Sequence, residues 1–145
     1  MKNLSPSLED YLEAAYTLSL KEGFSRACGI SRLLKVSKPS VNSAVKALAA
    51  RGLLEHEHYG YIRLSPAGLK AGAEISGRHA LLKDFFVSVL AMDENQAGED
   101  ACRAEHALSP EALRRVGALA VFLKAPPRRR LLLAARSAMS KRKNG

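Results

Sequence analysis

Residues 26–64 carry the pattern that most constrains the fold of this chain. Two short segments with apolar residues at helical spacing are separated by a tight turn that ends in Pro39. Two strand-like runs, 54–59 and 61–64, follow directly. The order helix, turn, helix, hairpin predicts a winged helix-turn-helix, whose second helix enters the major groove of DNA.

The rest of the chain predicts further helices. A first helix, capped by Ser7, is expected before Gly23. Further helices are expected from Ser-Pro starts and from helical spacing, over about 65–90, 96–108, 109–124 and 128–141. Ala125-Pro126-Pro127 predicts a linker. The expected fold is mainly α, with an all-helical part after the winged helix-turn-helix.

The positive charge is concentrated in two segments. The net charge is +9, and segments 26–54 and 124–145 hold six and eight basic residues without an acid. Clustered Lys and Arg release counterions from phosphates, so these segments suggest a polyanionic partner. A solvated surface is the alternative. For the C-terminal segment two interpretations stay open, a last helix of the dimer with Leu131, Leu132 and Ala135 buried, or a nonspecific DNA-binding extension.

The second helix of the motif is the predicted recognition helix. Its expected buried face holds Val41, Val45 and Leu48, and its outward face holds short polar side chains and a cation, which suit base edges and phosphates. Tyr59 or Tyr61 is expected to reach the sugar-phosphate backbone from the hairpin. The predicted DNA-binding residues are Arg26, Ser37, Lys38, Pro39, Ser40, Asn42, Ser43, Lys46 and Tyr59.

Cys102, Glu105 and His106 form the strongest candidate metal site. Their i, i+3, i+4 spacing places all three on one face of a helix. Thiolate, carboxylate and imidazole are ligands of first-row transition metals. The alternatives are a small core residue for Cys102 and surface charges for Glu105 and Arg103.

Three more residues join this site if their helices pack against it. His79 lies in the long helix, and Asp10 and Glu13 lie one turn apart in the first helix. Each has a structural alternative: Asp10 suits a capping box with Ser7, and His79 suits a hydrogen-bonded core histidine.

Several classes of protein are disfavoured. Two cysteines cannot form a disulfide framework, and the longest apolar run, 116–123, is too short for a membrane span. The N-terminus lacks the apolar segment of a signal peptide, so we expect a cytoplasmic protein. Neither a Gly-rich phosphate loop nor a nucleophile elbow is found, and we do not expect an enzyme or a small organic substrate.

Five stretches resemble the diphtheria toxin repressor family of metal-dependent transcriptional regulators. They are 7–14, 36–41, 59–62, 78–82 and 100–106. The resemblance covers about residues 5–125, and the Arg-His-x-Leu-Leu and Cys-Arg-x-Glu-His elements are its most specific parts.

The resemblance implies a homodimeric repressor with a winged helix-turn-helix DNA-binding domain (1–70) and a helical dimerisation and metal-binding domain (71–125). A basic C-terminal helix or tail (126–145) is expected after them from the residues themselves. A divalent metal, iron(II) or manganese(II), would bind between the domains and set the recognition helices for a palindromic operator. Carried over by position, the ligands are Asp10, His79, Cys102, Glu105 and His106, with Glu13 as an optional sixth. The chain ends too early for a C-terminal SH3-like domain, so we expect the short form of the manganese transport regulator branch.

The chain departs from the family pattern at several positions. Asp10 is typical of manganese-responsive members and Cys102 of iron-responsive members, so the site is a hybrid, and its thiolate favours softer ions than manganese(II). Lys83 and Gly98 stand where the iron branch has ligands of an ancillary site, which we expect to be absent or weak. Gly29 replaces an acidic residue, which is expected to remove an N-cap from the second helix.

These features predict a metal-activated repressor of metal-homeostasis genes. A winged-helix regulator without metal control is the alternative, in which the candidate ligands are core packing. A metalloenzyme with an open coordination position is the least favoured hypothesis.

Overall fold

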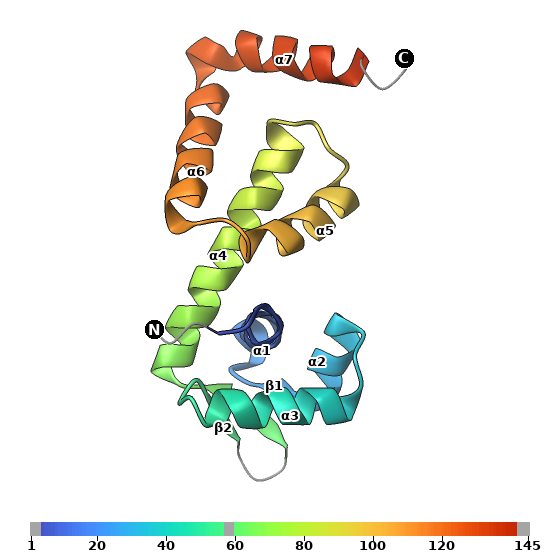
Figure 1. Cartoon of the computed structure of the whole chain (residues 1–145), viewed down its shortest axis with the longest axis vertical. Helices are drawn as coiled ribbons and strands as arrows, with labels where there is room; N and C mark the ends of the chain where they lie inside the picture. The colour runs from blue at the N-terminus through green and yellow to red at the C-terminus, as the bar shows by residue number, and fades with distance from the viewer. Residues whose placement is uncertain (1–3, 57–59, 142–145) are drawn as a thin grey trace. The chain divides into compact units, whose positions relative to one another are not determined.

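The computed structural model describes residues 4–56 and 60–141. The chain divides into two compact units, Met1–Ser76 and Gly77–Gly145, and each is described by itself. Helices predominate in both units, which confirms the expected mainly α fold (Figure 1). None of the described helices combines the length and the apolar character that a membrane span needs.

The first unit is a winged helix-turn-helix, as predicted. Its elements are α1 (Pro6–Glu22), β1 (Ser25–Arg26), α2 (Ala27–Leu34), α3 (Lys38–Ala49), β2 (Leu54–His56), β3 (Tyr61–Leu64) and the first part of α4 (Pro66–Ser88). The three strands form an antiparallel sheet in the order β1-β3-β2, with Ser25 opposite Ile62 and Leu54 opposite Leu64. Strand β1 was not predicted from the sequence, because two residues are too few to show an alternating pattern.

The core of this unit joins all its helices to the wing. Val41, Val45 and Leu48 are buried on α3, as predicted. The complete cluster is Leu12, Ala14, Ala15, Ile30, Val41, Val45, Leu48, Leu54, Ile62, Ala71 and Ile75. The buried face of α3 therefore lies against α1 and the sheet, and its polar face is left to solvent.

The start of α1 differs from the prediction. Ser5, not Ser7, is the N-cap, and its hydroxyl accepts a hydrogen bond from the backbone N–H of Leu8 over 3.4 Å. Pro6 fixes a backbone angle suited to the first helical position, so the helix begins there. Asp10 consequently lies beyond the N3 position, and its interpretation as part of a capping box with Ser7 was wrong.

The wing is tied to α4 by a close backbone approach. The backbone N–H of Ser65 donates to the carbonyl of Leu53 over 3.1 Å, and its hydroxyl donates to the carbonyl of Gly52 over 2.5 Å. The same hydroxyl accepts from the N–H of Gly68 over 3.0 Å, which confirms Ser65 as the cap of α4. A Cβ atom at Gly68 would lie 1.9 Å from the carbonyl oxygen of Leu53, so only glycine fits there.

One local prediction was wrong. Gly29 lies inside α2, whose N-cap is Arg26 without a side-chain cap bond, so Gly29 removes no N-cap. The reason is that β1 runs directly into α2, which leaves no loop residue to cap it. In the predicted linker between α6 and α7, Pro126–Arg128 forms the short 3-10 helix η1.

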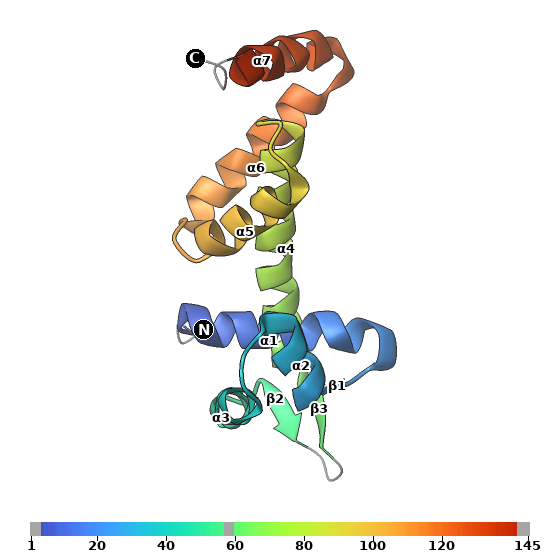
Figure 2. The ribbon, with the colours of Figure 1, turned by 90° about the vertical axis from the view of Figure 1, so that its right-hand side faces the viewer.

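The second unit is a helical bundle (Figure 2). It contains the rest of α4, α5 (Glu94–Glu105), α6 (Pro110–Lys124), η1 and α7 (Arg129–Lys141). Leu82, Ala101 and Leu113 form one buried cluster between α4, α5 and α6. Val89, Ala120 and Leu132 form a second cluster, which joins α7 to α4 and α6.

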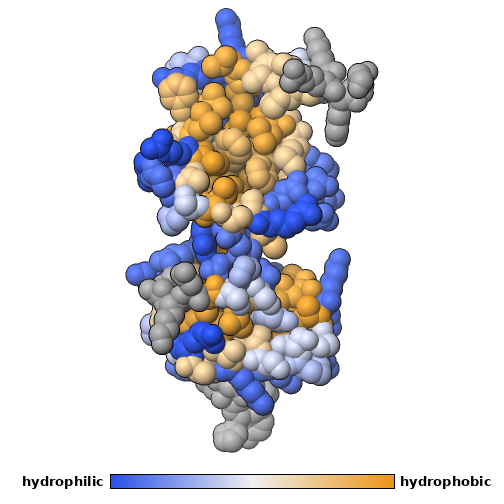
Figure 3. Space-filling model, in the orientation of Figure 1, coloured by the Kyte–Doolittle hydropathy of each residue, from blue (hydrophilic) through white to orange (hydrophobic). Residues whose placement is uncertain are grey.

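Much apolar surface of the second unit stays exposed within the single chain. On α7, Leu132 is buried, whereas Leu131 and Ala135 are exposed, so the expected burial of those two is not seen in one copy. Figure 3 shows apolar side chains gathered over this unit. The large exposed apolar residues here are Leu119, Val121, Phe122, Leu131, Leu133 and Met139.

Candidate metal centre and nucleic-acid interface

The N-terminus of α3 collects four of the predicted DNA-binding residues. Ser37 is the N-cap, and its hydroxyl accepts from the backbone N–H of Ser40 over 3.2 Å, while the two hydroxyl oxygens lie 2.8 Å apart. Lys38 and Pro39 form the first turn, and all four residues are exposed. The helix N-terminus, a lysine and two hydroxyl groups together suit a phosphate.

The outward face of α3 continues this surface. Asn42, Ser43 and Lys46 are exposed, as predicted. Asn42 and Lys46 line a shallow depression of about 330 Å³ together with Val45 and Ala49. Amide and ammonium groups beside small apolar residues suit base edges and thymine methyl groups.

Arg26 is held against the wing by aromatic side chains. Its guanidinium donates to the hydroxyl of Tyr61 over 3.0 Å and lies 4.8 Å from the centre of that ring. Phe24 packs edge-on against Tyr61, with ring centres 4.5 Å apart. Arg26 was predicted from the sequence as a DNA-binding residue, but its aromatic partners were not, because the pairing of β1 with β3 brings them together. Tyr59 lies outside the described residues.

Cys102, Glu105 and His106 come together at the end of α5. Asp93 caps the start of this helix by accepting from the N–H groups of Asn95 and Gln96. The helix ends at Glu105, with His106 as its C-cap, earlier than the expected end at residue 108. The three side chains still offer ligand atoms within 4.8 Å of one another.

Glu105 is the centre of this cluster and is fully buried, with an exposed fraction of 0%. Nδ1 of His79 is hydrogen-bonded to its Oε2 over 3.0 Å, and Nε2 of His106 lies 3.5 Å from its Oε1. A buried carboxylate needs a compensating positive charge or hydrogen bonds. The surface-charge interpretation of Glu105 was therefore wrong, whereas Arg103 is a surface charge.

The donor set of this unit fits a divalent transition metal. The carboxylate of Glu105 lies beside the imidazole of His79 and, in a second group, beside the imidazole of His106 and the thiol of Cys102. Cys102 stays partly exposed. Asp10 and Glu13 lie one turn apart on α1 in the first unit, and both are partly buried. Their participation in the same site stays a prediction.

Arg103 and Asp100 of α5 pair with each other. Arg103 bonds to Asp100, and this hydrogen bond, with a smaller one from Gln96, holds the pKa of Asp100 below its ordinary value. Arg103 is thereby engaged on the outside of the helix.

Two family models match the chain in sequence order. "Iron dependent repressor, N-terminal DNA binding domain" matches residues 3–62. "Iron dependent repressor, metal binding and dimerisation domain" matches residues 65–130. Together they cover the winged helix-turn-helix and most of the helical unit.

Curated relatives agree with this assignment. The HTH-type transcriptional regulator MntR of Bacillus pumilus is 34% identical over 131 residues, which cover 90% of this chain and 90% of the relative. An uncharacterized HTH-type transcriptional regulator of Methanocaldococcus jannaschii is 36% identical over 115 residues, which cover 78% of this chain and 91% of the relative.

Solved structures share the fold. The manganese regulator SloR superposes with a TM-score of 0.71 at 26% identity, over 85% of this chain and 56% of that chain. IdeR of T. acidophilum superposes with a TM-score of 0.68 at 24% identity, over 80% and 54%. This chain therefore spans about half the length of these solved chains. On its two domain matches and its relatives, the chain belongs to the iron-dependent repressor family of DNA-binding transcriptional regulators, and the resemblance found in the sequence is confirmed.

Proposed function

We propose that this protein is a homodimeric, metal-activated repressor of metal-homeostasis genes that binds a palindromic operator. The observation that carries the proposal is the fully buried Glu105 between His79 and His106, with Cys102 in reach. This cluster lies in a chain whose other unit is a winged helix-turn-helix. We propose no enzymatic activity, and a genomic DNA partner favours the cytoplasm as its location.

The proposed ligands come from both units. His79, Cys102, Glu105 and His106 would hold the ion on the helical unit, and Asp10, with Glu13, would bind it from α1. A metal ion supplies the positive charge that this set of carboxylates and thiolate needs. Ligands on two separate units make metal binding favour one arrangement of the units, which shifts the population toward it. A coupling free energy of ~1–3 kcal/mol would change operator affinity ~5- to 150-fold.

The thiolate of Cys102 favours iron(II) over manganese(II) as the activating ion. Thiolate is a softer ligand than carboxylate, and divalent-metal affinity at a given site rises from manganese to iron. Lys83 and Gly98 supply no carboxylate or imidazole, so we propose no ancillary site around them.

The DNA contacts follow from the exposed face of α3 and from the wing. Lys38, Ser40 and the helix N-terminus would contact phosphates, and Asn42 and Lys46 would face base edges or the backbone. Arg26, oriented by Tyr61, would contact the sugar-phosphate backbone beside the wing.

The decisive experiment is an anaerobic titration with iron(II), manganese(II), cobalt(II) and zinc(II). Affinity for DNA from the protein's own promoter region would be measured at fixed salt, with a chelator as control. We expect iron(II) to tighten binding at concentrations at which manganese(II) has little effect. The double variant Cys102→Ala/His106→Ala should lose this response, while Cys28→Ala, an exposed cysteine on α2, should keep it.

Each other outcome has a definite meaning. A response to manganese(II) alone would mean that the carboxylates outweigh the thiolate and would overturn the preference for iron(II). Unchanged metal-dependent affinity in the double variant would overturn the ligand set. No response to any metal would leave a metal-independent winged-helix regulator.

A further inference from the structure

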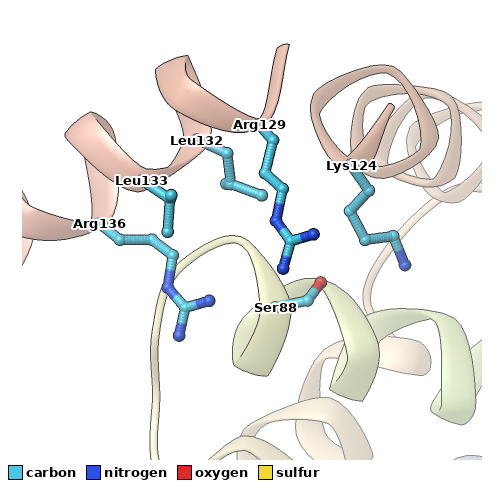
Figure 4. A pocket seen from close by; sticks show the side chains of 6 residues that line it. All are labelled: Ser88, Lys124, Arg129, Leu132, Leu133 and Arg136. Atoms are coloured by element: carbon cyan, nitrogen blue, oxygen red, sulfur yellow. The ribbon is translucent and has the colours of Figure 1, made fainter. Parts of the chain in front are cut away.

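A basic pocket in the second unit lies apart from the candidate metal ligands. It has a volume of about 290 Å³ and opens between the end of α4, the end of α6 and the first turns of α7 (Figure 4). The residues that line it are Ser88, Lys124, Arg129, Leu132, Leu133 and Arg136. This volume lies near the lower limit of ligand pockets, roughly 300–1,000 Å³, and suits a small ligand.

The charges around the pocket do not balance. Lys124 is neutralised by Asp84, since its Nζ lies 2.6 Å from Oδ2 of that residue. Arg129 and Arg136 form no ion pair in the part of the chain that the structure describes, and no acid follows Glu111 in the sequence. The C-terminal end of α4 supplies only about half a negative charge. At least one positive charge is therefore left for a ligand.

The hydroxyl of Ser88 is a second, independent observation at this pocket. Its Oγ is buried and has no hydrogen-bond partner among the described residues. Buried polar groups are almost always hydrogen-bonded, so a lone buried hydroxyl needs an explanation. Figure 4 shows this oxygen directed toward the side on which Arg129 and Lys124 lie.

We propose that this pocket binds a small phosphate-bearing anion through Arg129, Arg136 and Ser88. The two arginines lie two turns apart on one face of α7, and guanidinium groups bind phosphate oxygens through paired N–H donors. A phosphate group offers enough oxygens for two guanidinium groups and a hydroxyl at once. The leucines beside them form an apolar wall that leaves room for a small organic substituent.

A free phosphate group fits this pocket better than the backbone of duplex DNA does. Because Ser88 Oγ is buried, a ligand must enter the pocket to accept its hydrogen bond. A small anion can do so, whereas a phosphodiester is held in the backbone of the duplex. Once bound, the anion would bridge α7 to the end of α4 and so stabilise the second unit by mass action.

The test uses the full chain with a chelator present, at constant ionic strength set with chloride. Binding of inorganic phosphate is measured by calorimetry and by the rise in melting temperature. We expect saturable binding that Arg129→Gln/Arg136→Gln weakens by about tenfold or more, since charge-assisted hydrogen bonds are lost. Ser88→Ala should weaken phosphate binding without lowering the melting temperature of the free protein. Arg130→Gln, which removes an exposed charge from the same helix outside the pocket, should bind as the parent does.

Random-sequence duplex DNA forms the second arm of the test. If phosphate does not bind, or if Arg130→Gln weakens phosphate binding as much as the double variant does, the proposal is overturned. If Arg129→Gln/Arg136→Gln loses affinity for duplex DNA and free phosphate does not bind the parent, the two arginines contact the DNA backbone. The pocket then holds no small-anion site.

Discussion

Cys102 is the residue on which the metal preference depends. It is partly exposed at the end of α5, within reach of Glu105 and His106, and it is the one candidate ligand that contributes sulfur. A thiolate favours iron(II), cobalt(II) and zinc(II), whereas oxygen ligands favour manganese(II). This one sulfur atom is therefore expected to change the order in which the site prefers the divalent metals.

Replacing this sulfur should change the absorption spectrum of the cobalt(II) complex and the order of affinities for the divalent metals. We expect Cys102→Ser to remove the sulfur-to-metal charge-transfer absorption of the cobalt(II) complex. We also expect it to weaken the binding of cobalt(II) and zinc(II) more than the binding of manganese(II). Cobalt(II) titration followed by absorption spectroscopy measures both effects. Cys28→Ser is the matched control, since it removes an exposed cysteine from α2 in the other unit. An unchanged cobalt spectrum in Cys102→Ser would exclude sulfur ligation.

Glu111 gives a residue-scale prediction about pH. Hydrogen bonds from Arg114 and, second, Arg115 hold its pKa below the ordinary value of 4.5. A carboxyl group whose pKa is lower in the folded state stabilises the fold above its ordinary pKa, and this contribution is lost as the pH falls through the folded-state pKa. The group is exposed, so the effect on stability is small. In an NMR titration, the double variant Arg114→Gln/Arg115→Gln should raise the pKa of Glu111 toward its ordinary value; an unchanged pKa would show that the arginines are not its cause.

At the scale of elements, two glycines of α4 differ in what surrounds them. A Cβ atom at Gly68 would lie 1.9 Å from the backbone oxygen of Leu53, whereas a Cβ atom at Gly77 would meet nothing within 4 Å. Gly68 allows the start of α4 to lie against the wing, whereas Gly77 makes no such close approach. Substitution by alanine should therefore have opposite effects on stability at the two positions.

We expect Gly68→Ala to lower the free energy of unfolding by about 1–3 kcal/mol, because the wing must move away from α4. Gly77→Ala should raise it by roughly 0.5–1 kcal/mol, because alanine favours the helix. Urea denaturation of the full chain, followed by circular dichroism, measures both. A loss of stability in Gly77→Ala as large as that in Gly68→Ala would contradict the close approach at Leu53.

At the scale of the whole molecule, the exposed apolar side chains of the second unit predict where two copies meet. Val121 on α6 is 70% exposed in the single chain, although it belongs to the domain matched as a dimerisation domain. Leu20 on α1 is 65% exposed and lies in the domain matched as DNA-binding. Exposed apolar surface in a dimerising unit is expected to be covered by the second copy.

A charge at Val121 should therefore break the dimer without unfolding the chain. We expect Val121→Glu to weaken dimerisation at least tenfold, about 1.4 kcal/mol, because burial in the interface would strip the carboxylate of its hydration shell. Leu20→Glu should leave dimerisation unchanged. Analytical ultracentrifugation measures the dissociation constant, and circular dichroism checks the fold. Dimers of Val121→Glu as strong as those of the parent would place the interface elsewhere.

Much of the architecture was determined by local patterns along the chain. The faces of α3 followed from apolar residues at helical spacing, and the starts of α4 and α6 followed from Ser-Pro pairs, since a hydroxyl cap and a proline act on their own turn. The i, i+3, i+4 spacing of Cys102, Glu105 and His106 likewise placed three candidate ligands together, because neighbouring turns of one helix suffice for that.

Only the tertiary structure decided what depends on residues distant in sequence. The pairing of Glu105 with His79 joins two helices, and the aromatic support of Arg26 needs the short strand β1 beside β3. The basic pocket brings Ser88 near arginines from the end of the chain. These contacts arise from the packing of whole elements, which local patterns do not specify. The sequence by itself determined the types and faces of most elements and named the candidate ligands, whereas packing decided which of these side chains are buried and which of them meet.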